Sequence, residues 1–142
     1  MIKVLEYGSK EYLKTLFLRN DLMRKPVGKN LFDEDLSEEK EGYIFGYYFG
    51  NEIVGTCVLI PISDENVKLR FFCVREDYQG KNIGKEIFDF VKNFARDKGY
   101  SKIVFAARKT AVNFYRKLNC TETSEEYINK LGLVHIDMEY KI

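Results

Sequence analysis

The chain has 142 residues, a length that suits one domain (residues 1–142) with its own hydrophobic core. Hydrophobic residues make up 45% of it, and 23 basic against 22 acidic side chains give a formal net charge of +1. This balance argues against nucleic-acid binding, which normally needs a concentrated positive surface. The charged N-terminal segment lacks the apolar run of a secretory leader and no run spans a bilayer, so we expect a cytoplasmic protein without a membrane partner.

The first third of the chain predicts a strand, a helix and a polar loop. The strand is expected over residues 2–7, and Ser9 is placed to cap a helix that ends at about Lys25, before Pro26. Apolar residues at helical spacing predict its inner face, namely Leu13, Leu16, Phe17 and Leu22 or Met23. Residues 27–41 predict a loop with one helical turn around 36–40.

The same loop is rich in carboxylates, and two interpretations of them stay open. They could attract a cationic substrate, or they could form a solvated face, which is the commoner role of such a run and the one we favour. The residues are Asp33, Glu34, Asp35, Glu38, Glu39 and Glu41.

Three strands are predicted next, at residues 43–49, 53–60 and 67–74, joined by polar turns into an antiparallel meander. The apolar period then becomes helical and ends at Lys98-Gly99. Residues 102–107 are almost wholly apolar, as in a strand buried on both faces. A second helix at 110–118 and strands at 121–128 and 134–141 follow.

This order predicts an α/β (α+β) fold, a mixed and mostly antiparallel sheet of about seven strands flanked by helices. The three cysteines, Cys57, Cys73 and Cys120, are far apart and lie in apolar sequence. We expect buried reduced thiols rather than disulfides, a zinc site or a covalent nucleophile.

The most informative stretch is the junction from the strand that ends at Val74 to the helix that begins near Asn82. The first turn of a helix has unpaired N–H groups and a partial positive charge. Gly80 and Gly84 leave the backbone bare enough for an anion to approach, and Lys81 and Lys85 add charge. The pattern indicates a pyrophosphate site, although a plain surface turn is the alternative. The P-loop and Rossmann glycine patterns are absent.

Residues 79–84, Gln-Gly-Lys-Asn-Ile-Gly, resemble the Q/R-x-x-G-x-G/A motif of the GNAT superfamily of N-acetyltransferases. Asn82 replaces the first motif glycine, and asparagine is the non-glycine residue best able to adopt left-handed geometry. The resemblance implies that this segment binds the pyrophosphate of acetyl-CoA or coenzyme A, through Gln79, Gly80, Lys81, Asn82, Ile83, Gly84 and Lys85.

A second segment, residues 111–120, resembles the A-x-x-F-Y-x-K-L-G-F motif of the same family, with Asn119-Cys120 in place of Gly-Phe. Arg108 stands where many members have an asparagine, and we expect it to meet a coenzyme A phosphate instead. Residues 24–28 and 132–138 are similar to segments of a subgroup of small bacterial single-domain members. The resemblance thus covers nearly the whole chain.

The family's architecture implies a bulge in the strand before the loop and a splay between the fourth and fifth strands. The pantetheine arm would pair with Phe72, Cys73 and Val74, and a backbone N–H near Val74 would polarise the thioester carbonyl. Tyr115 is the expected general acid for the leaving thiolate, although a tyrosine on an amphipathic helix is also an ordinary core residue.

The general base is less well defined by the sequence. His135 is the only histidine, and its ordinary pKa of about 6.5 suits a base at neutral pH. It lies in a strand that could border the acceptor cleft, but a structural role and catalysis through ordered water are equally open. By resemblance, Arg19 and Arg24 border the acceptor site.

The resemblance therefore implies an acetyl-CoA-dependent N-acetyltransferase that acts directly, without an acyl-enzyme, on a primary amine of a small molecule or protein. The alternative is a coenzyme A-binding module with little or no catalytic activity, in a sensor or regulatory role. Either a monomer or a homodimer fits, and no metal is expected.

Overall fold

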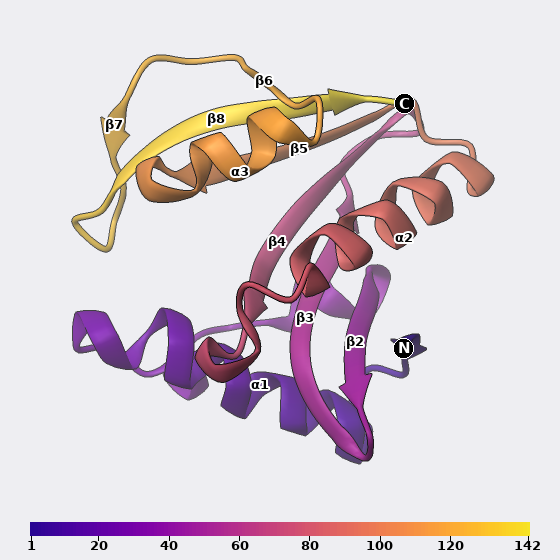
Figure 1. The fold of residues 1–142 in the computed structure, drawn as a ribbon, viewed down its shortest axis with the longest axis vertical. Helices are drawn as coiled ribbons and strands as arrows, with labels where there is room; N and C mark the ends of the chain where they lie inside the picture. The colour runs from indigo at the N-terminus through magenta and orange to yellow at the C-terminus, as the bar shows by residue number, and fades with distance from the viewer.

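The computed structural model describes residues 1–142 and consists of one eight-stranded sheet with helices on both faces (Figure 1). The strand order is β1-β2-β3-β4-β5-β8-β6, with β7 also paired to β8. The strands are β1 (Ile2–Leu5), β2 (Tyr43–Phe49), β3 (Glu52–Pro61), β4 (Asn66–Val74), β5 (Lys102–Arg108), β6 (Thr121–Glu122), β7 (Tyr127–Ile128) and β8 (Val134–Lys141). The predicted fold class is confirmed.

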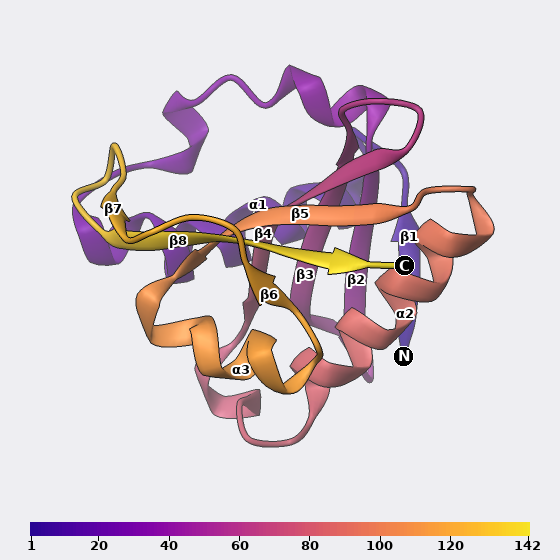
Figure 2. The same cartoon turned by 90° about the horizontal axis from the view of Figure 1, so that it is seen from above.

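The three α-helices are α1 (Lys10–Met23), α2 (Ile83–Asp97) and α3 (Val112–Lys117), and short 3-10 turns join several elements. These turns are η1 (Lys25–Val27), η2 (Leu31–Asp33), η3 (Ser37–Glu41), η4 (Glu76–Tyr78) and η5 (Lys109–Ala111). Helices α2 and α3 pack with the largest apolar core on one face of the sheet. Helix α1 packs on the other face, where the loop from α1 to β2 also lies (Figure 2). No helix combines the length and the apolar character needed to cross a bilayer.

The two central strands, β4 and β5, are parallel neighbours for only part of their length. They pair from Asn66 to Lys68 on β4, opposite Lys102 to Val104 on β5, and then diverge, as Figure 1 shows. Beyond this point each keeps its other neighbour, β3 for β4 and β8 for β5. The predicted splay is therefore present, and two unpaired strand edges face each other across it.

Strand β4 also contains the expected bulge. Arg70 pairs with Val58 and Cys73 pairs with Thr56, so Cys57 on β3 faces the two residues between them. A bulge of this kind bends its strand and increases the local twist, and here it occurs where β4 turns away from β5.

The bulge changes which side chains of β4 reach each face of the sheet. Leu69 lies in the core under α2 and α3, whereas Cys73 packs with the α1 cluster. Phe71 has a left-handed backbone with φ of 54°, which is unusual for a bulky residue. Both Arg70 and Phe71 thereby reach the α1 side, with the Arg70 guanidinium 4.7 Å from the ring centroid of Phe71.

The start of α1 is as predicted, but its buried face is predicted only in part, because Leu16, Leu22 and Met23 pack against the core while Leu13 and Phe17 do not. Ser9 caps the helix, because its hydroxyl accepts a hydrogen bond from the Tyr12 N–H. The predicted inner residues Leu13 and Phe17 are 46% and 54% exposed. The buried residues are instead Tyr12, Thr15, Leu18, Arg19 and Asn20. The helix is rotated in this way because polar members of that face bind the loop that follows it.

Two further expectations need correction. Strand β5 is not buried on both faces, because Ala106 is exposed where β4 has moved away, while Phe105 and Ala107 are buried on the core side. The strand predicted at 121–128 is two short bridges, Thr121–Glu122 and Tyr127–Ile128, both paired to β8. The predicted helical turn in the acidic loop is η3, and all three cysteines are buried free thiols as expected.

Candidate functional site

A cavity of about 710 Å³ fills the gap between β4 and β5 and extends to the start of α2 and to α3. This volume is within the usual range for ligand pockets. Most of the predicted site residues line it, namely Phe72, Cys73, Val74, Gln79, Gly80, Asn82, Ile83, Gly84, Lys85, Arg108 and Tyr115. Of the remaining four, Lys81, His135 and Arg19 line neither described cavity, and Arg24 lines a smaller one.

The loop before α2 presents a row of free backbone donors. None of the N–H groups from Gly80 to Lys85 donates a hydrogen bond to a protein acceptor, and the first such bond of the helix is from Glu86 to Asn82. Gly80 has φ of 77° and Asn82 has φ of 63°, so the expected left-handed geometry at Asn82 is confirmed. Such a set of N–H groups at a helix N-terminus fits a phosphate group.

Two contacts hold this loop in place. The side-chain amide of Gln79 donates to the carbonyl of Val74 at 2.9 Å, which ties the loop to the end of β4. Gly84 lies against Phe114 of α3, and a Cβ at Gly84 would stand 3.1 Å from the Phe114 Cζ atom. Phe114 was not predicted as a site residue, although it directly precedes Tyr115 in the second motif.

Tyr115 lines the cavity and is 7% exposed. Aromatic rings surround it, with the Phe105 centroid at 4.5 Å, Phe114 at 5.1 Å and Phe72 at 6.0 Å. Its hydroxyl forms no hydrogen bond within the protein, yet it is not among the polar atoms that are sealed from solvent. Burial raises the pKa of this phenol above its ordinary value, so the phenol keeps its proton at neutral pH.

Cys73 also lines the cavity, but burial raises the pKa of its thiol to about 12. A thiol that stays protonated is a poor nucleophile. This agrees with the expectation that no cysteine acts covalently.

His135 lies on β8, opposite Arg108 of β5, and is 8% exposed. Its Nδ1 atom is 3.1 Å from the carbonyl oxygen of Leu133, and its Nε2 atom is 3.5 Å from the side-chain amide of Asn129. The ring is therefore held by the turn between β7 and β8. It does not face the gap between β4 and β5 directly.

Arg19 and Arg24, predicted near the acceptor, are both engaged by the acidic loop. Arg19 Nη1 lies 2.9 Å from Glu39 Oε2, and both side chains are fully buried. Arg24 Nε lies 2.6 Å from Glu34 Oε2. The favoured interpretation of the acidic run as a solvated face is thus wrong for Glu39, because its charge is neutralised in the interior. The sequence gives no signal for these pairs, which join residues of separate elements.

A second cavity of about 180 Å³ lies on the α1 side of the gap. Two cationic residues that were not predicted as site residues, Lys68 and Arg70, line it together with Arg24. Their alternation along the predicted strand was visible in the sequence, but their position beside a gap in the sheet was not.

The arrangement of sheet, gap and helix is that of solved acetyltransferases. A putative N-acetyltransferase from Lactobacillus plantarum is 18% identical and matches with a TM-score of 0.84 over 99% of this chain and 97% of that one. A GNAT family acetyltransferase from Elizabethkingia anophelis, solved with acetyl-CoA bound, is 19% identical and has a TM-score of 0.75 over 100% and 97%. At such identities the likeness shows the fold alone.

The sequence comparison goes further than the fold. The model of the Acetyltransferase (GNAT) family matches residues 10–119. N-acetyltransferase 8 of Mus musculus is 29% identical over 90 residues, which are 58% of this chain and 40% of that protein, so the match spans less than half of this curated relative. The chain belongs to the GNAT acetyltransferase family.

Proposed function

We propose that the protein is an acetyl-CoA-dependent N-acetyltransferase that transfers the acetyl group directly to a primary amine of a small molecule or a protein. One observation carries this proposal. A single cavity connects the free N–H groups of Gly80 and of residues 82–85 with Tyr115, along the unpaired edges of β4 and β5. An extended molecule with an anionic middle and a reactive end fits this shape.

In the proposed complex, the N–H groups from Gly80 to Lys85 bind the pyrophosphate of coenzyme A. The unpaired edge of β4 between Phe72 and Val74 accompanies the pantetheine arm. Arg108 lines the same cavity and forms no ion pair within the protein, so its charge is available to a further phosphate. Gly84 has no side chain, so the ring of Phe114 packs closely against the first turn of α2.

In the proposed reaction, the neutral amine attacks the thioester carbonyl, a C–N bond forms and the C–S bond breaks. The backbone N–H near Val74 polarises the carbonyl oxygen. Tyr115 protonates the departing thiolate, and the proton lost by the amine restores the phenol through water in the cavity. Burial raises the pKa of Tyr115, and an apolar cavity raises the pKa of the departing thiol as well. Because both pKa values move in the same direction, burial does not by itself oppose proton transfer from the phenol to the thiolate.

The amine must lose a proton before it attacks, because an ordinary lysine-like amine has a pKa of about 10.4. We propose that water at the mouth of the cavity accepts this proton. His135 takes part only through such water, since it does not line the cavity.

A second candidate function is a coenzyme A-binding module with little or no turnover. It is favoured by one observation, that Glu76 is the only carboxylate that lines the larger cavity. Glu76 belongs to η4, in the loop between β4 and α2, rather than to the part of the cavity beside Tyr115.

The two candidates are separated by mixing the protein with acetyl-CoA and a panel of amines while free thiol is measured, with coenzyme A binding followed by calorimetry. We expect binding of coenzyme A and amine-dependent release of thiol. Binding without release on any amine would favour the second candidate. No binding at all would contradict both.

A further inference from the structure

We propose that the acceptor of this enzyme carries an anionic group, a carboxylate or a phosphate, in addition to its amine. Lys68 and Arg70 would bind that group in the smaller cavity. This inference rests on the proposed function, because it names the class of amine that the site accepts.

The smaller cavity is a cationic extension of the larger one. Three of its seven lining residues are Arg24, Lys68 and Arg70, and none is a carboxylate. The two cavities adjoin, because five residues line both of them, namely Met23, Leu69, Arg70, Phe71 and Ala106. A molecule anchored in the smaller cavity therefore extends into the gap where β4 leaves β5.

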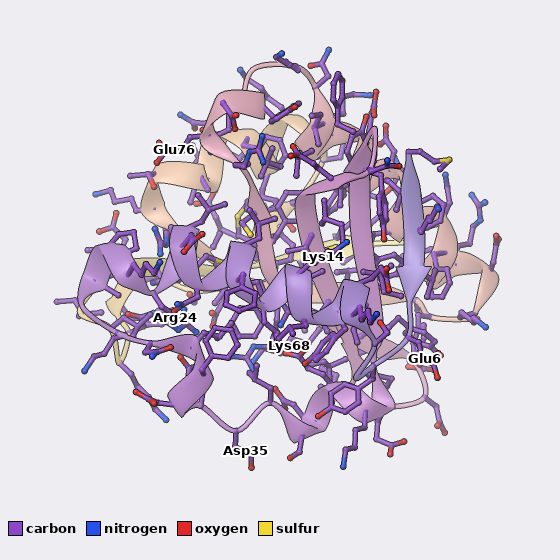
Figure 3. The ribbon with its side chains drawn as sticks, turned by 90° about the horizontal axis from the view of Figure 1, so that it is seen from below. Glu6, Lys14, Arg24, Asp35, Lys68 and Glu76 are labelled. Atoms are coloured by element: carbon purple, nitrogen blue, oxygen red, sulfur yellow. The ribbon has the colours of Figure 1, made fainter.

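The cations converge on this cavity for reasons of backbone geometry. Lys68 and Arg70 are two residues apart on β4, so they point to the same face of the sheet. The bulge adds Phe71 to that face, and Arg24 approaches from the end of α1, with its guanidinium 5.3 Å from the Phe71 centroid. Figure 3 shows Arg24 and Lys68 between α1 and the loop that carries Asp35.

Nearby carboxylates neutralise only part of this charge. Arg24 binds Glu34 through Nε and Nη2, and Arg70 binds Glu38 through Nη1 alone. The Nε and Nη2 groups of Arg70 keep free donors. Lys68 forms no ion pair or side-chain hydrogen bond in the protein.

The other elements that line this cavity add no carboxylate to its wall. Strand β5 contributes only Ala106 to the cavity. Asp137 of β8 pairs in register with Ala106, but it is not a lining residue and it accepts the hydroxyl of Tyr127 at 2.5 Å. Lys68, which is exposed, and Arg70, which is half-buried, thus offer unpaired donors at this cavity, and charge-assisted hydrogen bonds to an anion are stronger than neutral ones.

The first test compares amines that differ only in the anionic group. Each set holds an ω-amino acid, its amide and the matching aminoalkyl phosphate, for example β-alanine, β-alaninamide and O-phosphoethanolamine, with spacers of increasing length. We expect kcat/KM for the best anionic member to exceed that of its amide by roughly tenfold or more. Whether the carboxylate or the phosphate is preferred identifies the group. Amides that react as well as the acids at every spacer would overturn the inference.

The second test assigns the preference to the cavity. In Lys68→Gln and Arg70→Gln we expect the ratio of kcat/KM for the anionic acceptor to kcat/KM for its amide to fall toward one. The KM for acetyl-CoA should be unchanged. Lys14→Gln is the matched control, since Lys14 is exposed on α1 away from this cavity (Figure 3). A ratio that persists in Lys68→Gln, a variant that removes no ion pair or side-chain hydrogen bond, would overturn the inference.

A binding measurement separates this inference from the proposed function. N-acetyl-β-alanine and N-acetyl-β-alaninamide, with longer homologues, are titrated into the protein with coenzyme A, and backbone amide shifts near Ala106 are followed by NMR. Selective binding of the acids that is lost in Lys68→Gln supports the anion site even if no amine is acetylated. Turnover of amines together with equal or absent binding of the acids would overturn the anion site alone.

Discussion

Arg19 of α1 and Glu39 of η3 form an ion pair, with 2.9 Å between Nη1 and Oε2, in which both side chains are fully buried. The hydroxyl of Tyr12 donates to the same carboxylate at 2.7 Å. The Arg19 guanidinium also lies 4.9 Å from the ring centroid of Phe71, in the bulge of β4. This pair therefore links α1 and the acidic loop to the point where the sheet opens.

The first prediction concerns this ion pair. Removing one partner leaves an uncompensated buried charge, and the Nε and Nη2 groups of Arg19 already lack partners. We expect Glu39→Gln to lower the free energy of unfolding by about 3–5 kcal/mol, measured by urea denaturation. The double variant Arg19→Met, Glu39→Met should cost less than the sum of the single changes.

The matched control is Glu38→Gln, because Glu38 is half-exposed in its pair with Arg70. It should cost no more than about 1 kcal/mol. A Glu39→Gln variant as stable as Glu38→Gln would show that the buried pair does not hold the loop.

The second prediction concerns Asn82, which has φ of 63° directly before α2. Left-handed geometry costs most residues about 1–2 kcal/mol. We expect Asn82→Ala to be destabilised by about that amount and to bind coenzyme A more weakly, whereas Asn82→Gly should keep both properties. Calorimetry and urea denaturation measure the two effects. Asn93→Ala, at an exposed site on α2, is the control, and an Asn82→Ala protein that behaves like it would argue against a strained loop.

The third prediction concerns Tyr115. If its phenol protonates the leaving thiolate, Tyr115→Phe should lower kcat by about 10²-fold or more and leave coenzyme A affinity unchanged. Because burial raises the pKa of Tyr115, its phenol stays protonated at least up to a pH of about 10. Below that pH, deprotonation of Tyr115 should not lower the wild-type rate. Tyr140→Phe, which alters another tyrosine packed on the same core, is the control. Equal kcat in the two variants would remove Tyr115 from the mechanism.

The fourth prediction is a loss of stability in alkali. Burial raises the pKa of the Cys73 thiol to about 12 and raises the pKa of Cys57 further. In the unfolded chain both ionise near their ordinary pKa of about 8.5. The folded state keeps these protons, so the stability that they contribute is complete below this pH and is lost as the pH rises toward the folded values.

Each thiol should steepen the fall in unfolding free energy by up to about 1.4 kcal/mol per pH unit between pH 9 and 10. Urea denaturation across this range, under reducing conditions, measures the slope. In Cys73→Ala the pH dependence of the unfolding free energy should become shallower by the contribution of one thiol, whatever the variant's stability at pH 7. An unchanged slope would mean that Cys73 is not protected in the folded state.

The part of the site that depends on local backbone was predictable from the sequence. A strand, a loop and the start of a helix follow one another at residues 67–85, so Gly80 and Gly84 indicated an anion site there. The resemblance to the family motif added Asn82. The resemblance of residues 111–120 to the second motif singled out Tyr115, and the structure shows that this residue lines the cavity.

The part that depends on distant contacts was not predictable. Hydrophobic periodicity favoured Leu13 and Phe17 on the inner face of α1, but the fold buries Arg19, because Glu39 is brought to it from a separate loop. A single sequence does not show that two opposite charges, 20 residues apart, are paired in the interior. For the same reason the cationic cavity at Lys68 emerged only from the structure.

The central claim is that the N–H groups from Gly80 to Lys85 bind the pyrophosphate of coenzyme A. The most direct measurement is a titration of the isotope-labelled protein with coenzyme A, followed through the backbone amide signals by NMR. We expect saturable binding with the largest shifts at these six amides, and much smaller shifts when pantetheine, which lacks the pyrophosphate, replaces coenzyme A. Saturable binding that leaves these six signals unmoved, or no binding at all, would contradict it.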